Sequence, residues 1–248
     1  MSKILVIGDS CKDVYIYGSC DRVAPDAPVP VFVPAYQHQN FGMAANVFQN
    51  IVSLKCPATI KSNQLFVEKA RYVDEKSNHM FIRIDSGEEA ISRIADLSLD
   101  TFKDYELVVI SDYDKGFLLK EDIQFICENH PLVFIDTKKT IGSFLKDCSF
   151  LKINKQEYEA SGDFINDNKW CYEKLIATLG KDGCMHKNQI YAVDEVEIKD
   201  VSGAGDTFLA GLCVNYLETR NIEKAINYAN RCASQVVQRK GVTTINET

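Results

Sequence analysis

Residues Asp200 to Phe208 read DVSGAGDTF, and an apolar helical pattern from Leu209 to Leu217 follows them directly. A helix that begins in small residues leaves several backbone N–H groups without partners, and its dipole adds positive charge at that end. The small residues here are Gly203, Ala204 and Gly205. They predict an anion site at the start of the helix. Asp206 would lie in the first turn, where an isolated aspartate usually caps a helix or favours its dipole.

Five short apolar runs, most of them ending in a polar or acidic residue, predict buried strands of a mainly parallel sheet. These runs are Lys3–Asp9, Glu106–Asp112, Pro131–Asp136, Phe150–Asn154 and Lys174–Gly180. Between them lie helical patterns, of which Ile222–Val237 is the clearest. Alternating strands and helices predict a doubly wound α/β fold, in which ligands bind at the carboxyl ends of the strands. The polar residues at those ends are Asp9, Asp112, Asp136 and Asn154.

A second kind of segment interrupts this alternation. The β-rich segments are Val14–Gly18, Val29–Tyr36 and Ala70–Asp85. Prolines punctuate the middle one, and proline within a strand pattern indicates an edge strand or an irregular ribbon. We therefore predict a small β flap that stands off the main sheet. Residues 1–248 would form a single domain, with flap segments around residues 14–36 and 70–85.

Composition excludes several classes of protein. The chain has 248 residues, 46% of them hydrophobic, which suits one soluble domain with a sizeable core. A formal net charge of −7 argues against a nucleic acid or an anionic membrane as partner, because both require a basic face. None of the nine cysteines has the spacing of a zinc site, and no apolar stretch approaches the length of a membrane span. The hydrophobic run at the N-terminus is too short for a signal peptide, so we expect a cytoplasmic protein.

Four further motifs accompany GAGDTF in a fixed order along the chain. They are Gly8-Asp9 with Asp13, Gly42-Met-Ala-Ala-Asn46, Asn154 with Glu157, and Thr178-Leu-Gly-Lys-Asp-Gly183. Over nearly its whole length the chain resembles the ribokinase-like carbohydrate kinase family. The resemblance implies an enzyme that uses ATP and Mg²⁺. The sequence has neither GxxxxGK[ST] nor GxGxxG after the first strand, which disfavours a P-loop NTPase and a Rossmann dehydrogenase.

The resemblance implies a role for each matching residue. Asp206 is the base that takes the proton of the acceptor hydroxyl, beside an anion hole formed by Gly203, Ala204 and Gly205. The implied substrate-binding residues are Asp9, Asp13, Arg22, Gly42, Asn46, Asp112 and Lys115. The implied nucleotide-binding residues are Lys138, Asn154, Glu157, Thr178, Gly180, Gly183 and Asn230. Of these, Asn154 and Glu157 would hold Mg²⁺ through water, although a plain strand-end turn is the alternative for this pair.

Side-chain chemistry also supports the expected contacts with sugar hydroxyls and with a sugar phosphate. Carboxylates such as Asp9 and Asp13 accept hydrogen bonds from sugar hydroxyls, and Arg22 and Lys115 could donate to a sugar phosphate. A solvated surface role is the alternative for each of these basic residues.

The helix after Gly42 places Asn46 and Asn50 on one face, and Asn50 could be a surface residue. Met43 stands where the family has its second glycine, so we expect it to crowd the approach to the sugar.

Two segments narrow the substrate. Arg22–Val31 and Ser111–Gly116 resemble the heptose 7-phosphate kinase branch, which phosphorylates the anomeric hydroxyl of a lipopolysaccharide precursor. The alternatives are a kinase for another sugar or a nucleoside, and a non-catalytic relative that only binds a nucleotide or a sugar phosphate. Intact Asp206, Asn154 and Glu157 favour an enzyme, because binding alone requires no base.

The chain departs from the family between Asn46 and Phe81, where it is shorter than expected. A helix and part of the lid should be absent, which affects the closing of the site over the sugar. We expect a homodimer through the β flap, because the segment Pro28–Tyr36 is apolar and needs a cover. Relatives often carry a fused nucleotidyltransferase domain, and here we expect another protein to supply that step.

Overall fold

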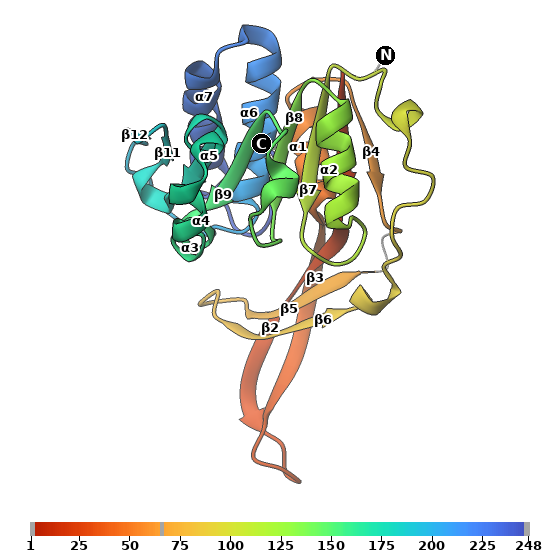
Figure 1. Ribbon diagram of the computed structural model, residues 1–248. Helices are drawn as coiled ribbons and strands as arrows, with labels where there is room; N and C mark the ends of the chain where they lie inside the picture. Colours follow the sequence, from red (N-terminus) through yellow and green to blue (C-terminus); the bar gives the residue numbers. More distant parts are fainter. Residues whose placement is uncertain (1–2, 65–66, 246–248) are drawn as a thin grey trace.

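The computed structural model describes residues 3–64 and 67–245, and these residues form two sheets (Figure 1). The larger sheet has the strand order β12-β11-β10-β9-β8-β7-β1-β4. Its strands are β1 (Ile4–Gly8), β4 (Ala58–Ser62), β7 (Leu107–Asp112), β8 (Val133–Thr137), β9 (Phe150–Asn154), β10 (Leu175–Thr178), β11 (Cys184–His186) and β12 (Gln189–Tyr191). From β4 to β10 neighbouring strands are parallel, and only β11 and β12 add antiparallel pairs at one edge.

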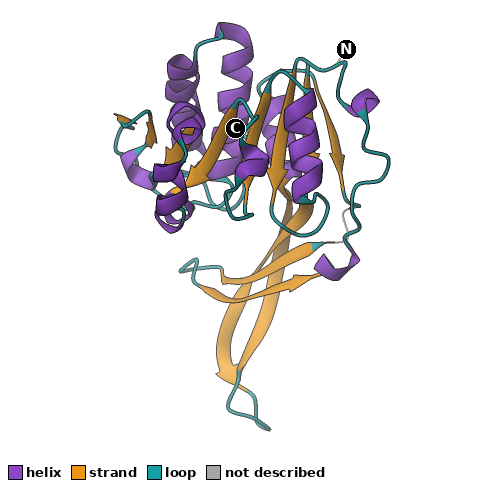
Figure 2. Cartoon of the chain, viewed as in Figure 1, coloured by secondary structure: helices purple, strands orange, loops and turns teal. Residues whose placement is uncertain are grey.

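Helices cover both faces of this sheet (Figure 2). They are α1 (Ala44–Ser53), α2 (Lys120–Asn129), α3 (Lys155–Ala160), α4 (Gly162–Asp167), α5 (Lys169–Lys174), α6 (Ala204–Thr219) and α7 (Ile222–Val236). Side chains of β1 alternate between two cores: Ile4 and Val6 pack with α1, α6 and α7, whereas Leu5 and Ile7 pack with α2. A sheet buried on both faces explains why its strands are continuous apolar runs. The predicted doubly wound α/β fold is confirmed.

The second sheet has the order β3-β2-β5-β6 and projects from the carboxyl ends of the main strands (Figure 1). Its strands are β2 (Ser10–Val23), β3 (Pro30–Met43), β5 (Glu68–Asp74) and β6 (Met80–Ser86). The flap is therefore present where the sequence predicted it, and β3 is an edge strand. The strands β2 and β3 are longer than the predicted segments Val14–Gly18 and Val29–Tyr36, and they form a hairpin. Pro34 is accommodated because β3 is an edge strand and the β2–β3 register shifts between Tyr17 and Gly18, beside the pair of Pro34 with Gly18.

The link between the two sheets after β4 is short. Residues 63–67 join β4 to β5, which leaves too few residues for a helix of several turns, as expected from the sequence. The Asn63 side chain holds this link against β2: its Oδ1 accepts from the Ser10 N–H at 2.7 Å, and its Nδ2 donates to the Ser10 carbonyl at 3.0 Å. One amide side chain thus takes the place of a strand's backbone pairing.

Within residues 3–64 and 67–245, no helix combines the length and the apolar character that crossing a membrane requires.

Candidate functional site

The start of α6 forms the centre of the site. Gly203 precedes the helix with a φ of 77°, a left-handed conformation that favours glycine, and a Cβ at this position would lie 2.8 Å from Asn46 Nδ2. Asp206 follows in the first turn and is only 5% exposed. Its Oδ2 accepts from Asn46 Nδ2 at 2.9 Å, and its Oδ1 accepts from the Tyr113 hydroxyl at 2.7 Å. The carboxylate is thus held between α1 and the segment after β7.

Burial raises the pKa of Asp206 to about 6, and the Asp136 carboxylate also raises it. The hydrogen bonds from Asn46 and Tyr113 and the Lys152 ammonium act in the opposite direction. A carboxyl group with a pKa near 6 is a stronger base than an ordinary aspartate and is still ionised at neutral pH. The site therefore suits general-base chemistry.

Anion-binding donors lie at the same helix end. The Ala204 N–H donates to the Val201 carbonyl at 3.2 Å, so this member of the predicted anion hole is already occupied. The N–H groups of Gly205 and Asp206 have no acceptor within the described part of the chain. Lys152 Nζ is next to them, because a Cβ on Gly205 would lie 3.0 Å from it. Free N–H groups beside an ammonium group suit phosphate oxygens.

Lys152 was not predicted from the sequence. It lies in β9 and is 4% exposed, and its Nζ contacts Asp136 Oδ2 of β8 at 2.6 Å. The sequence did contain a signal for this residue: a lysine lies in the middle of an otherwise apolar buried strand. Such a buried charge requires a partner of opposite charge.

The loop after β7 is organised by Asp9. This side chain is 0% exposed, and its oxygens accept N–H groups of Tyr113 at 2.7 Å and of Lys115 and Phe117 at 3.3 Å. Burial and the nearby Asp112 carboxylate raise the pKa of Asp9. Asp9 thus holds the loop that carries Tyr113, and its predicted contact with the substrate stays a prediction.

Three other predicted substrate contacts have partners or positions that differ from the expectation. Asp112 is 1% exposed and pairs with Lys139 Nζ at 2.9 Å, and it also accepts from the Thr137 hydroxyl. Lys115 pairs with Glu88 at 2.6 Å. Arg22 lies near the tip of the β2–β3 hairpin, which extends away from the main sheet (Figure 1). Within one chain, Arg22 and Lys115 therefore do not come together as the phosphate contact that the sequence suggested.

Asp13 and Gly42 lie together where the flap meets α1. A Cβ on Gly42 would be 2.1 Å from Asp13 Oδ2, so only glycine permits this approach. Asp13 also forms a partly buried ion pair with Arg71 of β5. Met43 has a φ of 60° and is 3% exposed. Its side chain packs with Cys11 and Val67, so it fills a small hydrophobic core beside the site.

The asparagines of α1 share one face, as predicted. Asn50 Nδ2 donates to Asn46 Oδ1 at 3.0 Å and to the Asn46 carbonyl at 2.9 Å. Its own Oδ1 accepts from the Thr207 hydroxyl at 3.3 Å and from the Ile245 N–H at 3.2 Å. The alternative that Asn50 is a surface residue is wrong, since it is 0% exposed. It fixes the orientation of the Asn46 amide toward Asp206.

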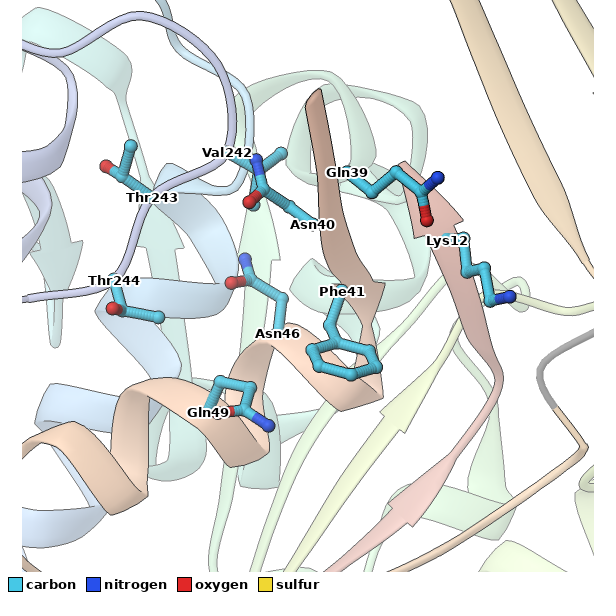
Figure 3. Close-up of a pocket in the computed structure, with 9 residues that line it drawn as sticks. All are labelled: Lys12, Gln39, Asn40, Phe41, Asn46, Gln49, Val242, Thr243 and Thr244. Carbon is cyan, nitrogen blue, oxygen red and sulfur yellow. The ribbon is translucent and has the colours of Figure 1, made fainter. Parts of the chain in front are cut away.

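A cavity of about 390 Å³ adjoins Asn46 (Figure 3). Its lining residues are Lys12, Gln39, Asn40, Phe41, Asn46, Gln49, Val242, Thr243 and Thr244. Lys12 is the one charged residue among them, and within residues 3–64 and 67–245 it forms no ion pair. Asn40 Nδ2 and Thr243 Oγ1 are shielded from solvent and have no hydrogen-bond partner in the described chain. Such a lining suits a ligand with several hydroxyl groups.

Asn154 and Glu157 form a capping box at the start of α3. Asn154 Oδ1 accepts from the Glu157 N–H at 2.9 Å, and Glu157 Oε2 accepts from the Asn154 N–H at 2.8 Å. The other Glu157 oxygen pairs with Lys138, whose Nζ lies 3.8 Å from Asp136 and 5.7 Å from the centre of the Tyr113 ring. The strand-end turn is therefore present, and it directs Glu157 Oε1 toward Lys138, which lies close to Asp206.

The remaining predicted nucleotide contacts lie toward the β10–β12 edge. Thr178 ends β10, and Gly180 and Gly183 follow with φ values of 64° and 86°. Asn230 Nδ2 donates to the Tyr191 carbonyl at 2.8 Å, and a Cβ on Gly183 would lie 2.1 Å from the same oxygen. Gly183 and Asn230 are thus brought together. Among the described residues, no group of three or more His, Cys, Asp or Glu side chains is placed to hold a metal ion.

Comparison with known proteins gives three findings. The model of the pfkB carbohydrate kinase family matches residues 69–248. The bifunctional protein HldE of a Nitratiruptor species is 30% identical over 292 aligned positions, which cover 98% of this chain and 63% of that protein. The HldE of Campylobacter curvus is 31% identical, with coverages of 98% and 63%. The chain thus spans less than two thirds of the length of these curated relatives, and their alignments contain segments with no counterpart here.

Solved structures share the fold. A ribokinase from Thermotoga maritima has a TM-score of 0.71 at 15% identity, covering 98% of this chain and 95% of that one. The Arabidopsis thaliana ribokinase complexed with ribose and ATP has a TM-score of 0.72 at 15% identity, with coverages of 97% and 94%. At this identity the likeness concerns the fold alone.

Proposed function

The chain belongs to the pfkB family of carbohydrate kinases, and from this premise we propose that it phosphorylates the anomeric hydroxyl of heptose 7-phosphate with ATP. The observation that carries the proposal is Asp206, buried at the start of α6 beside free N–H groups and Lys152. A base and an anion site at one helix end are the two elements that phosphoryl transfer to a hydroxyl requires.

In the proposed reaction, Asp206 accepts the proton of the acceptor hydroxyl while the hydroxyl oxygen forms a bond to the γ-phosphorus. The bond from that phosphorus to the bridging oxygen breaks, and ADP leaves. Asn46 keeps the carboxylate in place through its hydrogen bond to Oδ2. The N–H groups of Gly205 and Asp206 stabilise the charge on the phosphoryl oxygens.

The donors near α6 fit the phosphates of ATP, because Lys152 and Lys138 both lie close to Asp206 and Asp136. The Mg²⁺ that normally accompanies ATP supplies charge neutralisation between the phosphates. Glu157 and Asn154 would hold it through water, since the capping box and Lys138 already engage their oxygens. Gly180, Gly183 and Asn230 stay predictions for the nucleotide side.

We place the distal part of the acceptor in the cavity beside Asn46 (Figure 3). Asn40 Nδ2 and Thr243 Oγ1 offer hydrogen bonds to hydroxyl groups, and Lys12 offers a charge for the 7-phosphate. Lys12 takes the role suggested for Lys115, because Lys12 lines this cavity and Lys115 does not.

Heptose 7-phosphate should be a much better acceptor than unphosphorylated heptose. Losing one hydrogen bond to a charged group costs about 1.5–3 kcal/mol, so kcat/KM should be roughly 10- to 100-fold lower for the unphosphorylated sugar. Steady-state kinetics with both acceptors measures the ratio. Lys12→Gln should shrink the ratio, and Lys115→Gln is the matched control that should leave it intact. Equal kcat/KM for the two sugars in the wild type would remove the sugar-phosphate assignment and leave the kinase fold untouched.

We also predict a homodimer through the flap. Large apolar side chains of β3 and β6 are uncovered in one chain: Val33 is 53%, Tyr36 56% and Ile82 55% exposed. An exposed apolar sheet face favours association with a second copy. Sedimentation velocity should show a dimer that Ile82→Asp converts to a monomer. A wild-type monomer at every practical concentration would contradict this prediction.

A further inference from the structure

The geometry points to Tyr113 as a stand-in for the acceptor: its hydroxyl occupies the position on Asp206 that the acceptor hydroxyl must take, and the sugar displaces it. This inference rests on the proposed role of Asp206 as the base. Tyr113 is a positioning residue in this account, because it touches the base and not the reacting atoms. Nothing in the motif GAGDTF reveals it, since Tyr113 is 93 residues away in the chain.

The first observation is the direct contact. The Tyr113 hydroxyl donates to Asp206 Oδ1 at 2.7 Å, while Oδ2 is engaged by Asn46 at 2.9 Å. Burial raises the pKa of Tyr113 well above its usual value, so the hydroxyl remains a donor at physiological pH. An acceptor hydroxyl must donate its proton to this same carboxylate, and Oδ1 is the oxygen that the protein does not hold with α1. Tyr113 and the sugar therefore compete for one position.

The second observation is that the backbone and the ring of Tyr113 are held by different contacts. Asp9 holds the N–H groups of Tyr113, Lys115 and Phe117, which fixes the loop. The ring itself is packed between separate parts of the molecule: Lys69 Nζ of the flap lies 5.6 Å from its centre, and Lys138 Nζ lies 5.7 Å from it. In the proposed displacement the side chain rotates about its own bonds while Asp9 keeps the loop in place, and the ring gives up its packing against the cluster of Cys11 and Met43.

The charged and titratable groups around Asp206 come from several elements. They are Cys11 of β2, Tyr113 after β7, Asp136 of β8, Lys138 after β8 and Lys152 of β9. Asp136 raises the pKa of Asp206, whereas Lys152 and the Tyr113 hydrogen bond lower it. Of these, only the Tyr113 contact would be lost when the acceptor takes its position.

The consequence is control of wasteful hydrolysis. While Tyr113 is on Asp206, both carboxylate oxygens have donors and the side chain is 5% exposed, so the base is closed to water. ATP bound at that stage meets no activated nucleophile. A sugar that fills the site opens the base as it binds, which couples ATP consumption to the presence of the acceptor.

The test begins without sugar. Tyr113→Phe removes only the hydroxyl, so water gains access to Oδ1 and ATP hydrolysis in Mg·ATP alone should rise on the order of tenfold, the effect of one hydrogen bond to an ionised group. The rise should vanish in the double variant Tyr113→Phe with Asp206→Asn. Tyr172→Phe is the matched control, because Tyr172 is 50% exposed and distant in sequence, and it should hydrolyse ATP like the wild type.

The pH profiles with heptose 7-phosphate separate displacement from a fixed contact. The profile of kcat/KM reports the free enzyme, where the Tyr113 hydrogen bond lowers the pKa of Asp206, so Tyr113→Phe should move the acidic limb to higher pH. The profile of kcat reports the complex, from which the hydroxyl has already been displaced, so its acidic limb should not move.

Unchanged hydrolysis in Tyr113→Phe, or equal shifts of both acidic limbs, would overturn the inference. The second of these results would mean that Tyr113 stays on Asp206 throughout the reaction. Failure of the proposed function has a different signature, because then the wild type would give no phosphorylated sugar with heptose 7-phosphate, whatever Tyr113 does.

Discussion

Asp206→Asn should lower kcat by roughly 10²–10⁴, the usual contribution of a positioned general base. Asparagine keeps the size of the side chain and can still accept from Asn46 or Tyr113, but it cannot take the proton of the acceptor hydroxyl. Phosphoryl transfer depends mainly on positioning and electrostatics, so some residual turnover is consistent with this role. Steady-state kinetics with heptose 7-phosphate measures the loss, and the KM for Mg·ATP should change little.

Folding of the Asp206→Asn variant provides its control. The folded-state pKa of about 6 lies above the ordinary value of 3.8 because of burial, so ionisation of Asp206 destabilises the fold as the pH rises through that window. The variant should therefore be at least as stable as the wild type at pH 8 and lose this advantage below about pH 4. A large loss of ATP binding would assign Asp206 to the metal instead, and wild-type turnover would leave it as a helix cap.

Lys152→Met should reduce the free energy of unfolding by about 3–5 kcal/mol, because it leaves the Asp136 carboxylate buried without its partner. Both side chains are 4% exposed, and Asp136 Oδ1 has no hydrogen-bond partner among the described residues. Lys138, 3.8 Å from Asp136, offers only partial compensation, so the loss should fall near the lower end of that range.

Urea unfolding of Lys152→Met, compared with Lys103→Met, measures this effect. Lys103 also pairs with an aspartate, Asp100, but it is 57% exposed, and such surface pairs contribute about 0–1 kcal/mol. Adding Asp136→Asn to Lys152→Met removes the unpaired buried charge and should recover part of the lost free energy of unfolding. Equal destabilisation by the two methionine variants would mean that the Lys152–Asp136 pair does not hold the strand ends together.

The sequence predicted the elements that carry the main sheet. Buried parallel strands show as continuous apolar runs, so β9 was placed at Phe150–Asn154, as the structure has it, and α7 differs from its prediction by one residue. The lengths of the flap strands β2 and β3 were underestimated, and in β3 the prolines indicated an edge strand or an irregular ribbon. The β2–β3 hairpin absorbs Pro34 on an edge strand beside a register shift, a compensation that only the pairing of two strands reveals.

Among the site residues, those in local motifs were predicted and their distant partners were not. Local motifs located Asp206, Asn46 and the capping box of Asn154 with Glu157. Partners far apart in the chain were missed, because no local pattern fixes which strand end faces which side chain. Tyr113 reaches Asp206 because the loop after β7 meets the start of α6, and Lys152 reaches Asp136 because β8 and β9 pair in that register. Lys115 was assigned to a phosphate from its charge and its motif, and its ion pair with Glu88 was not predicted.

The chemistry at Asp206 can be tested most directly by identifying the product. Phosphorus NMR of a mixture of the protein, Mg·ATP and heptose 7-phosphate should show ADP and, in equal amount, a second phosphate ester on the sugar at its anomeric carbon. The Asp206→Asn protein should form that ester far more slowly under the same conditions. ADP without a new sugar phosphate, or a doubly phosphorylated sugar carrying the new group elsewhere than the anomeric carbon, would contradict the account.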